Sequence, residues 1–394
     1  MFCFAGLQVV LNMAAKPIKV VITGASGEIG LMVSYMMAKE EICGAGQLID
    51  LVMVENRSRM KQLRGAVGEI KTCNLTNVQN YITTDNLIEA FTDADIIFLV
   101  GGLFSAPGFS RNDVIGMNAL EFKEIGLALS KVAKATVKIV VVVEPQNINL
   151  MVLSYFAPDL KPCNLTALSR VDHNRAQTML ARMLNISSDK IVHLTMWGNR
   201  SITIFPDIRH AKIEIKGKLL PAYEAIKDDF YLKYKFTEEL QNREAEILKK
   251  RKTSGCFQTV AIAAVQHMSD WIHGTKPGDW TSMIVMSDGS YGIDKGLAYS
   301  FPVRVSAAGE WEIVSDLDIN YYEREKLDER VNEIKAERMF AYGILELPEA
   351  KIEVQKDEEG AVDQARATKW SFGHAEPLPC SILGVLEQDR LGTM

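Results

Sequence analysis

The sequence lacks the cysteine pairs, long apolar runs and basic excess that mark several classes of protein. Its six cysteines are scattered without a C-x-x-C pair, which argues against a zinc site and favours a reducing compartment. No run of roughly 18 uncharged apolar residues occurs, so no membrane-spanning helix is expected. Lys and Arg number 44 and Asp and Glu 50, so the net charge of −6 is not that of a typical nucleic-acid-binding protein. We therefore predict no metal site, no membrane contact and no nucleic-acid partner.

Both ends of the chain differ from its body. The stretch 1–15 is apolar but has no charged n-region and no Arg, so neither a secretory signal nor a mitochondrial transit peptide fits. We interpret residues 1–16 as an N-terminal extension and expect a cytoplasmic protein, with a cytoskeletal or ciliary assembly as the alternative location. In residues 347–394 the apolar periodicity fades and acidic residues gather, which predicts a mostly disordered acidic tail that could dock in a protein assembly.

The first half alternates short β-branched runs with helical patterns. The expected strands are Ile18–Thr23, Leu51–Val54, Val78–Thr83, Asp95–Val100 and Val137–Val143, and a long helix is expected from Arg111 to about Ala133. This alternation predicts an α/β domain with a doubly wound parallel sheet. We place this domain at residues 17–162.

The second half predicts an α+β domain at residues 163–346. Its expected helices are Asp172–Leu184, Phe236–Arg251, Phe257–His273 and Ile319–Leu345, and its expected strands are Lys212–Lys218, Met283–Met286 and Ser300–Val305. The run 212–218 alternates apolar and charged residues, as a half-exposed strand does.

A glycine motif joins the first predicted strand to the helix that follows it. Gly24, Gly27 and Gly30 have the spacing of a dinucleotide fingerprint, which is weak alone but is supported by this strand–turn–helix context. The glycines would let a pyrophosphate approach a helix N-terminus. Glu55 ends the second strand, where an acid accepts hydrogen bonds from ribose hydroxyls and repels a 2′-phosphate, which favours NAD over NADP. Two nearby arginines, Arg57 and Arg59, weaken that preference, and a glycine turn needed only for packing is the alternative.

A second motif, Asp172-His173-Asn174-Arg175, begins a predicted helix. Asp172 and Arg175 share one helical face at i, i+3 spacing, so they suit the roles of an orienting carboxylate and an anion clamp. A surface ion pair is the alternative interpretation.

With these motifs the sequence resembles the cytosolic-type malate dehydrogenases over residues 17–345. The resemblance rests on segments in matching order, namely Thr23–Gly30, Asp95–Gly101, Asp172–Ala176, Met196–Asn199, Pro206–Asp207, Ser287–Gly292 and Tyr299–Val303. It implies a Rossmann domain, an α+β substrate domain, a homodimer and NAD-dependent interconversion of malate and oxaloacetate, with a small 2-hydroxy or 2-oxo acid as substrate.

The resemblance also implies roles for individual residues. Asp172 matches the aspartate that orients the catalytic histidine, and Arg175 matches the arginine that clamps the substrate carboxylate. Arg111 matches a distal arginine of the mobile loop, and Asn118 matches an asparagine that contacts the cofactor. The three glycines and Glu55 match the other cofactor positions.

Three positions depart from the family pattern. Arg200 stands where the catalytic histidine follows W-G-N, Ser105 replaces a substrate-selecting arginine, and Glu144 replaces a substrate-binding asparagine. Arginine cannot act as a general base, because its high pKa keeps it protonated at neutral pH. Loss of a general acid or base typically costs about 10²–10⁴ in rate. We expect Arg200 to pair with Asp172, and we expect neither His193 nor His210 to replace the histidine.

These departures leave three hypotheses open. The first is an NAD-binding protein that has lost most malate turnover and acts in binding or assembly. The second is an active dehydrogenase for malate or another 2-hydroxy acid, with an apolar loop formed by Phe104 and Phe109. The third is a structural component that no longer binds nucleotide. A mixed site for an anion or a zwitterion could also form, if Asp172 and Glu144 lie close to Arg111, Arg175 and Arg200. The alternative is that these substitutions accumulated in a pocket that is no longer used.

Overall fold

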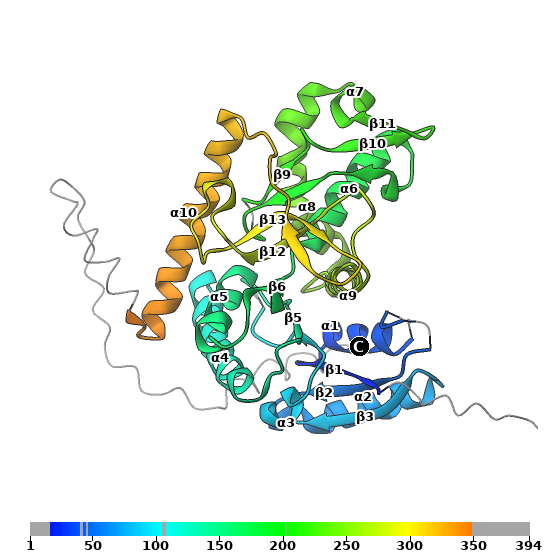
Figure 1. Ribbon diagram of the computed structural model, residues 1–394, viewed down its shortest axis with the longest axis vertical. Coiled ribbons are helices and arrows are strands. Elements are labelled where there is room, and N and C mark those ends of the chain that lie inside the picture. The colour runs from blue at the N-terminus through cyan, green and yellow to red at the C-terminus, as the bar shows by residue number, and fades with distance from the viewer. Residues whose placement is uncertain (1–15, 40–41, 45, 105–107, 202, 349–394) are drawn as a thin grey trace, which may run out of the picture. The chain divides into compact units, whose positions relative to one another are not determined.

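The protein is described by a computed structural model (Figure 1). The structure describes residues 16–39, 42–44, 46–104, 108–201 and 203–348. The chain divides into two units, residues 1–350 and residues 351–394, and all described residues belong to the first unit. Residues 1–15 of the expected extension and nearly all of the expected acidic tail therefore lie outside the described residues.

One sheet forms the centre of the first unit. Its parallel strands are β1 (Ile18–Ile22), β2 (Ile49–Val54), β3 (Val78–Thr84), β4 (Ile96–Leu99), β5 (Lys138–Val141) and β6 (Leu165–Ala167), and its antiparallel strands are β12 (Thr281–Met286), β13 (Ala298–Val305) and β14 (Trp311–Ile313). Within the described part of the chain the order is β14-β13-β12-β6-β5-β4-β1-β2-β3. The run β3-β2-β1-β4-β5-β6 is the doubly wound Rossmann order, which confirms the predicted fold.

Helices cover both faces of this sheet. The connecting helices are α1 (Glu28–Lys39), α2 (Met60–Thr72), α3 (Leu87–Phe91), α4 (Arg111–Val132) and α5 (Gln146–Phe156). The strand order reverses between β1 and β4, so right-handed crossovers put α1 and α4 on opposite faces. On the first face α9 (Phe257–His273) packs against α1, and on the second α10 (Tyr321–Ile344) packs against α4 and α5 (Figure 1).

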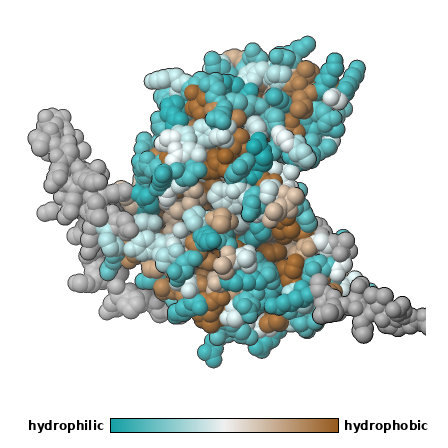
Figure 2. All heavy atoms as spheres, viewed as in Figure 1, coloured by the Kyte–Doolittle hydropathy of each residue, from teal (hydrophilic) through white to brown (hydrophobic). Residues whose placement is uncertain are grey.

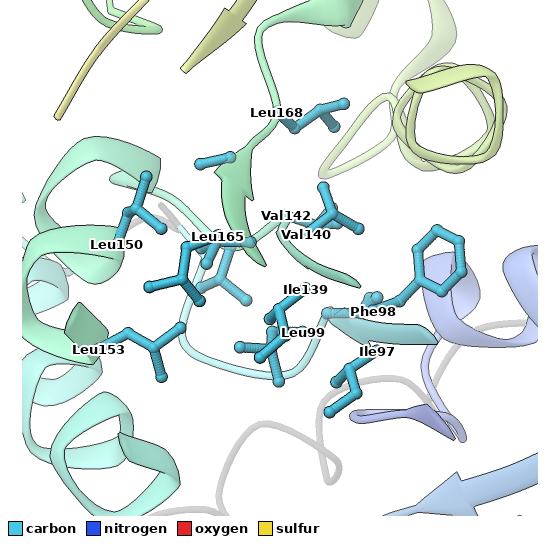
Figure 3. Close-up of a cluster of buried hydrophobic side chains, with 14 of the residues drawn as sticks. Ile97, Phe98, Leu99, Ile139, Val140, Val142, Leu150, Leu153, Leu165 and Leu168 are labelled. Atoms are coloured by element: carbon cyan, nitrogen blue, oxygen red, sulfur yellow. The ribbon is translucent and has the colours of Figure 1, made fainter. Parts of the chain in front are cut away.

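The core lies where the β-branched strands meet these helices. Val137–Val143 is buried except at Lys138, as expected for a strand covered on both faces. Leu150 and Leu153 of α5 project toward Leu99 and Ile139 of the sheet (Figure 3). Each such side chain contributes about 1.5–3 kcal/mol when fully buried. Apolar residues on the face in Figure 2 form patches between hydrophilic ones, and no helix in the described ranges is long and apolar enough to cross a membrane.

A second core lies in the C-terminal half. It is built from α6 (Arg170–Leu184), β7 (Ile191–Val192), β8 (Thr195–Trp197), β9 (Phe205–Asp207), β10 (Lys212–Ile215), β11 (Lys218–Pro221), α7 (Ala222–Ile226) and α8 (Phe236–Arg251). The predicted single strand at 212–218 is wrong, because β10 and β11 form an antiparallel hairpin. Lys216 (φ 51°) and Gly217 (φ 76°) form its turn, and two residues with positive φ suit a two-residue hairpin turn.

The glycine turn after β1 is set by a close approach of two backbones. Gly24 has φ 57°, and a Cβ placed on it would lie 2.6 Å from the nitrogen of Gly101, which follows β4. A Cβ on Gly30 would lie 2.7 Å from the Cα of Ala25. Side chains at these two positions would push the turn away from the sheet.

We predict that Gly24→Ala lowers the free energy of unfolding by at least about 2 kcal/mol, because it adds a left-handed backbone strain to a steric clash. Gly65→Ala is the matched control, since Gly65 is exposed on α2 and a Cβ there would meet nothing within 4 Å. The control should gain about 0.5–1 kcal/mol. Urea unfolding of both variants measures the difference, and equal stabilities would contradict the assigned turn.

Candidate active site

Glu55 is tied to the glycine turn. The carboxylate follows β2 and is buried, and its Oε2 accepts hydrogen bonds from the backbone nitrogen (3.2 Å) and the hydroxyl (2.6 Å) of Ser26. Its Oε1 accepts one hydrogen bond from the Asn56 nitrogen at 3.0 Å. Ser26 stands between Gly24 and Gly27, so the acid and the turn that opens α1 form one hydrogen-bonded unit. Oε1 is the carboxylate oxygen with more capacity for a further donor.

Asn118 fixes the two segments that follow β4 and β5. Its Oδ1 accepts from the Leu103 nitrogen at 2.7 Å, and its Nδ2 donates to the carbonyl oxygens of Leu103 (2.9 Å) and Glu144 (2.7 Å). The residue is buried on α4. Asn118 thus positions the backbone of Glu144, beyond the role that the resemblance implied for it.

The segment after β8 that presents Arg200 is held from three sides. Gly198 has φ 97°, and its carbonyl oxygen accepts from Asn147 Nδ2 (3.2 Å) and from the Ser300 nitrogen (2.7 Å). A Cβ on Gly198 would lie 2.9 Å from the Cβ of Arg330 on α10. These contacts place Arg200 next to the first turn of α6.

Arg200, Asp172 and Arg175 form the buried centre of an ionic cluster. Arg200 Nε lies 3.3 Å from Asp172 Oδ2, so the expected ion pair is present. Arg175 Nη1 donates to Asp172 Oδ1 at 2.9 Å. The three side chains are 7–9% exposed.

Two glutamates complete this cluster on its more exposed side. Arg200 Nη1 pairs with Glu144 Oε1, and Arg200 Nη2 donates to Glu244 Oε2 at 2.6 Å. Glu244, on α8, also lies 3.0 Å from Arg175 Nη1. Glu144 is 26% and Glu244 33% exposed. We call these five residues the arginine–carboxylate cluster.

The cluster carries more negative than positive charge. Two guanidiniums and three carboxylates give a formal charge of 2 − 3 = −1 when all are ionised. Burial raises the pKa of Asp172 to about 6, against the opposing effect of Arg175 and with help from Glu244. Burial also acts to raise the pKa of Glu244, but Arg200 and Arg175 outweigh it and lower that pKa. At pH 7 the cluster therefore keeps close to its full excess of negative charge.

Comparisons with known proteins identify the family. The family model for the lactate/malate dehydrogenase NAD binding domain matches residues 18–164, and the model for the alpha/beta C-terminal domain matches residues 169–340. The chain belongs to the lactate/malate dehydrogenase family. Cytoplasmic malate dehydrogenase of Gallus gallus is 40% identical over 331 residues, covering 84% of this chain and 98% of the relative. The human cytoplasmic enzyme is 38% identical over 332 residues, covering 84% and 99%.

Solved structures of the family agree with this assignment. A malate dehydrogenase from Naegleria fowleri has a TM-score of 0.79 at 32% identity, covering 84% of this chain and 99% of its own. A Trichomonas vaginalis lactate dehydrogenase in complex with NADH and oxamate has a TM-score of 0.79 at 32% identity, covering 83% and 99%. The family is one of NAD-dependent dehydrogenases, which confirms the cofactor expected from the glycine motif and Glu55.

The residues predicted from the dehydrogenase pattern are only partly brought together. Arg175, Arg200, Asp172 and Glu144 meet in the cluster, as the sequence allowed. Arg111 does not join them: it begins α4, and its guanidinium pairs with Glu337 of α10, which packs on α4. Ser105, which the resemblance matches to a substrate-selecting arginine, lies outside the described residues.

Sequence reasoning missed Glu244. It stands in a charged helix 44 positions from its partner Arg200. Its only sequence signal is that buried arginines need carboxylate partners, and that rule does not say which acid supplies one.

The two histidines weighed as replacements have partners elsewhere. His193 Nε2 lies 2.6 Å from the Gly278 carbonyl oxygen, and His210 Nδ1 lies 2.8 Å from Asp207 Oδ2. Across the residues that the structure describes, no group of three or more His, Cys, Asp or Glu side chains could hold a metal ion.

We predict that NADH binds at least tenfold more tightly than NADPH, because Glu55 would repel a 2′-phosphate. Glu55→Gln should bring the dissociation constants of NADH and NADPH closer together. Arg57 is an exposed cation close to Glu55, so Arg57→Ala should weaken the binding of NADPH alone. Fluorescence titration of each variant measures both constants. Tighter binding of NADPH by the unmodified protein would contradict the role given to Glu55.

Asp172 should make stability depend on pH. Folding raises the pKa of Asp172 from an ordinary 3.8 to about 6, so the folded state binds the proton more tightly than the unfolded state. This proton binding contributes fully to the free energy of unfolding below pH 3.8, and the contribution is lost as pH rises through 6. Between pH 7 and pH 5 the protein should gain about 1 kcal/mol of unfolding free energy relative to Asp172→Asn. Urea unfolding at several pH values tests this, with Asp85→Asn at an exposed position as the control that keeps the original profile. Parallel profiles for Asp172→Asn and the unmodified protein would show that Asp172 titrates normally.

Proposed function

We propose that this protein is an NAD-binding member of its family in which malate–oxaloacetate interconversion is lost or strongly reduced. The observation that carries the proposal is the ion pairing of Arg200 with Glu144, Asp172 and Glu244. The resemblance matches Arg200 to the position of the family's catalytic histidine. In this proposal the protein acts by binding rather than by malate turnover.

The first support is the missing proton carrier. Oxidation of malate requires a base for the hydroxyl proton, and the reverse reaction requires an acid at the same oxygen. A guanidinium is not a general base, and that of Arg200 is already paired with three carboxylates. It can attract an anion, but it cannot take the proton that histidine takes.

The second support is electrostatic. Malate brings two negative charges to a cluster whose formal charge is already −1. A like-charge pair at about 6 Å costs about 3 kcal/mol at an effective dielectric of about 20. At about 1.4 kcal/mol per factor of ten, this weakens binding by roughly two factors of ten before the loss of the arginine at Ser105 is counted.

The cofactor residues fit NAD. A Cβ on Gly24 or Gly30 would clash with neighbouring backbone, so only glycine lets the turn lie this close to the sheet, and Glu55 is hydrogen-bonded to that turn. Gly24, Gly27, Gly30 and the N-terminus of α1 would hold the pyrophosphate, and Glu55 the ribose hydroxyls. When bound, NADH supplies a hydride. The chain's own residues orient the cofactor through Asn118, which fixes both neighbouring segments.

A second candidate is a dehydrogenase for another 2-oxo acid. It is favoured by the raised pKa of Asp172, about 6, which lies in the range in which histidine exchanges protons. Phe104, partly buried against the main core, would then border a site for an apolar substrate. Against it, Asp172 is 7% exposed and lies behind Arg200 and Arg175. The protein would be cytoplasmic in either case, as the names of its relatives say of them, and a homodimer is what the family resemblance implies.

The test is oxaloacetate-dependent NADH oxidation by the full-length protein, beside an independent titration of NADH binding. The unmodified protein should bind NADH and turn over at least about a hundredfold more slowly than an ordinary dehydrogenase. A variant carrying Arg200→His, Ser105→Arg, Glu144→Asn and Glu244→Gln should gain at least about tenfold in rate, because it restores a base and removes the opposing charges.

The control is Arg200→His alone. It leaves Glu144 and Glu244 without their guanidinium partner, so it should gain little activity and lose stability. Rapid turnover by the unmodified protein would overturn the proposal. Rapid turnover that Asp172→Asn abolishes would instead establish the second candidate.

A further inference from the structure

The arginine–carboxylate cluster has one guanidinium edge without a partner. Arg175 uses Nη1 for Asp172 and Glu244, whereas Nε and Nη2 are buried and make no hydrogen bond to any described residue. The Arg175 side chain is only 9% exposed. Nε and Nη2 form the side edge of the guanidinium, which matches the two oxygens of a carboxylate. A buried donor pair of this kind is costly to leave unmade, which points to a ligand carboxylate.

The other half of the cluster offers the opposite charge. Glu144 and Glu244 are its most exposed members, so the side of the cluster nearest to solvent is negatively charged. Both glutamates contact Arg200, each through a different nitrogen of its guanidinium, and Glu244 also lies 3.0 Å from Arg175 Nη1. An ammonium group has three donors and can bridge such a pair of carboxylates.

These two halves define the charge of the ligand. A group with one carboxylate and one adjacent ammonium leaves the formal charge of the cluster at −1, since −1 + 0 = −1. A monoanionic 2-hydroxy acid takes it to −1 − 1 = −2, and a dianion to −1 − 2 = −3. Each added unpaired charge is unfavourable in a site this buried.

We infer that the site binds a small zwitterionic α-amino acid in place of a hydroxy acid. The ligand carboxylate pairs with the free edge of Arg175, and its ammonium pairs with Glu144 and Glu244. This inference rests on the proposed function, because it takes the cofactor to be bound and malate turnover to be lost. It involves binding only, with no chemical step.

The test uses pairs of ligands that differ in one group. Alanine is lactate with an ammonium in place of the hydroxyl, and aspartate is malate with the same exchange. Binding of each to the full-length protein saturated with NADH is measured by isothermal titration calorimetry. Alanine should bind at least tenfold more tightly than lactate, and aspartate at least tenfold more tightly than malate.

Three variants locate the two halves of the site. The double variant Glu144→Gln, Glu244→Gln should lose the preference for the amino acid while keeping NADH binding. Arg175→Gln should weaken all four ligands by at least tenfold. Glu214→Gln is the matched control, since Glu214 pairs with Lys190 at the surface and should leave every constant unchanged.

Several outcomes would overturn the inference. These are a preference for lactate over alanine, a preference that survives the double glutamate variant, and absence of amino-acid binding at millimolar concentration. Measured on the same sample, NADH binding and oxaloacetate turnover report on the proposed function separately. Cofactor binding without turnover and without amino-acid binding would leave that function standing and remove only the inference.

Discussion

A buried guanidinium must keep its charge and therefore must be paired. Arg200 is 8% exposed, and burial of an unpaired ion costs several kcal/mol, so the surrounding chain has to supply carboxylates. Glu144 comes from the segment after β5, Asp172 from α6 and Glu244 from α8. The Arg200 side chain thus connects the segment between β5 and α5 with two helices of the C-terminal half. The conformation of each segment in the site depends on this pairing.

The pairing also relates two of the departures from the family to each other. Taken alone, Glu144 would place a carboxylate where the resemblance implies an anionic substrate, and Arg200 would place a second cation beside Arg175. Together they form an ion pair and offset one another. Asn118 holds the backbone of Glu144 through a hydrogen bond to its carbonyl oxygen. Forming the ion pair therefore costs only side-chain conformational entropy.

Much of the fold, but less of the site, could be predicted from the sequence. Hydrophobic periodicity located β1 to β5 and the long helices. β-branched runs that alternate with helical patterns fit few folds other than an α/β sheet. It missed β6 and β9, which have three residues each, and the uniformly apolar α5, and it did not identify Gly217 as part of a turn. The local pair Asp172 and Arg175 was predictable from helical spacing, and Arg200 from its place after W-G-N. Glu244 was not, because a contact across 44 positions depends on how helices pack and not on any local pattern.

The cluster also explains why changing Arg200 alone would be a poor test of the proposed function. Removing one partner of a buried ion pair costs about 3–5 kcal/mol, since the other charge stays behind without compensation. With Arg200 changed to histidine, Glu144 and Glu244 would lose that guanidinium, and Arg175 would turn more strongly to its remaining acids. The histidine would then lie among carboxylates that repel a dianion such as malate. Because these charged side chains share their partners, a test of the proposed function has to change them together.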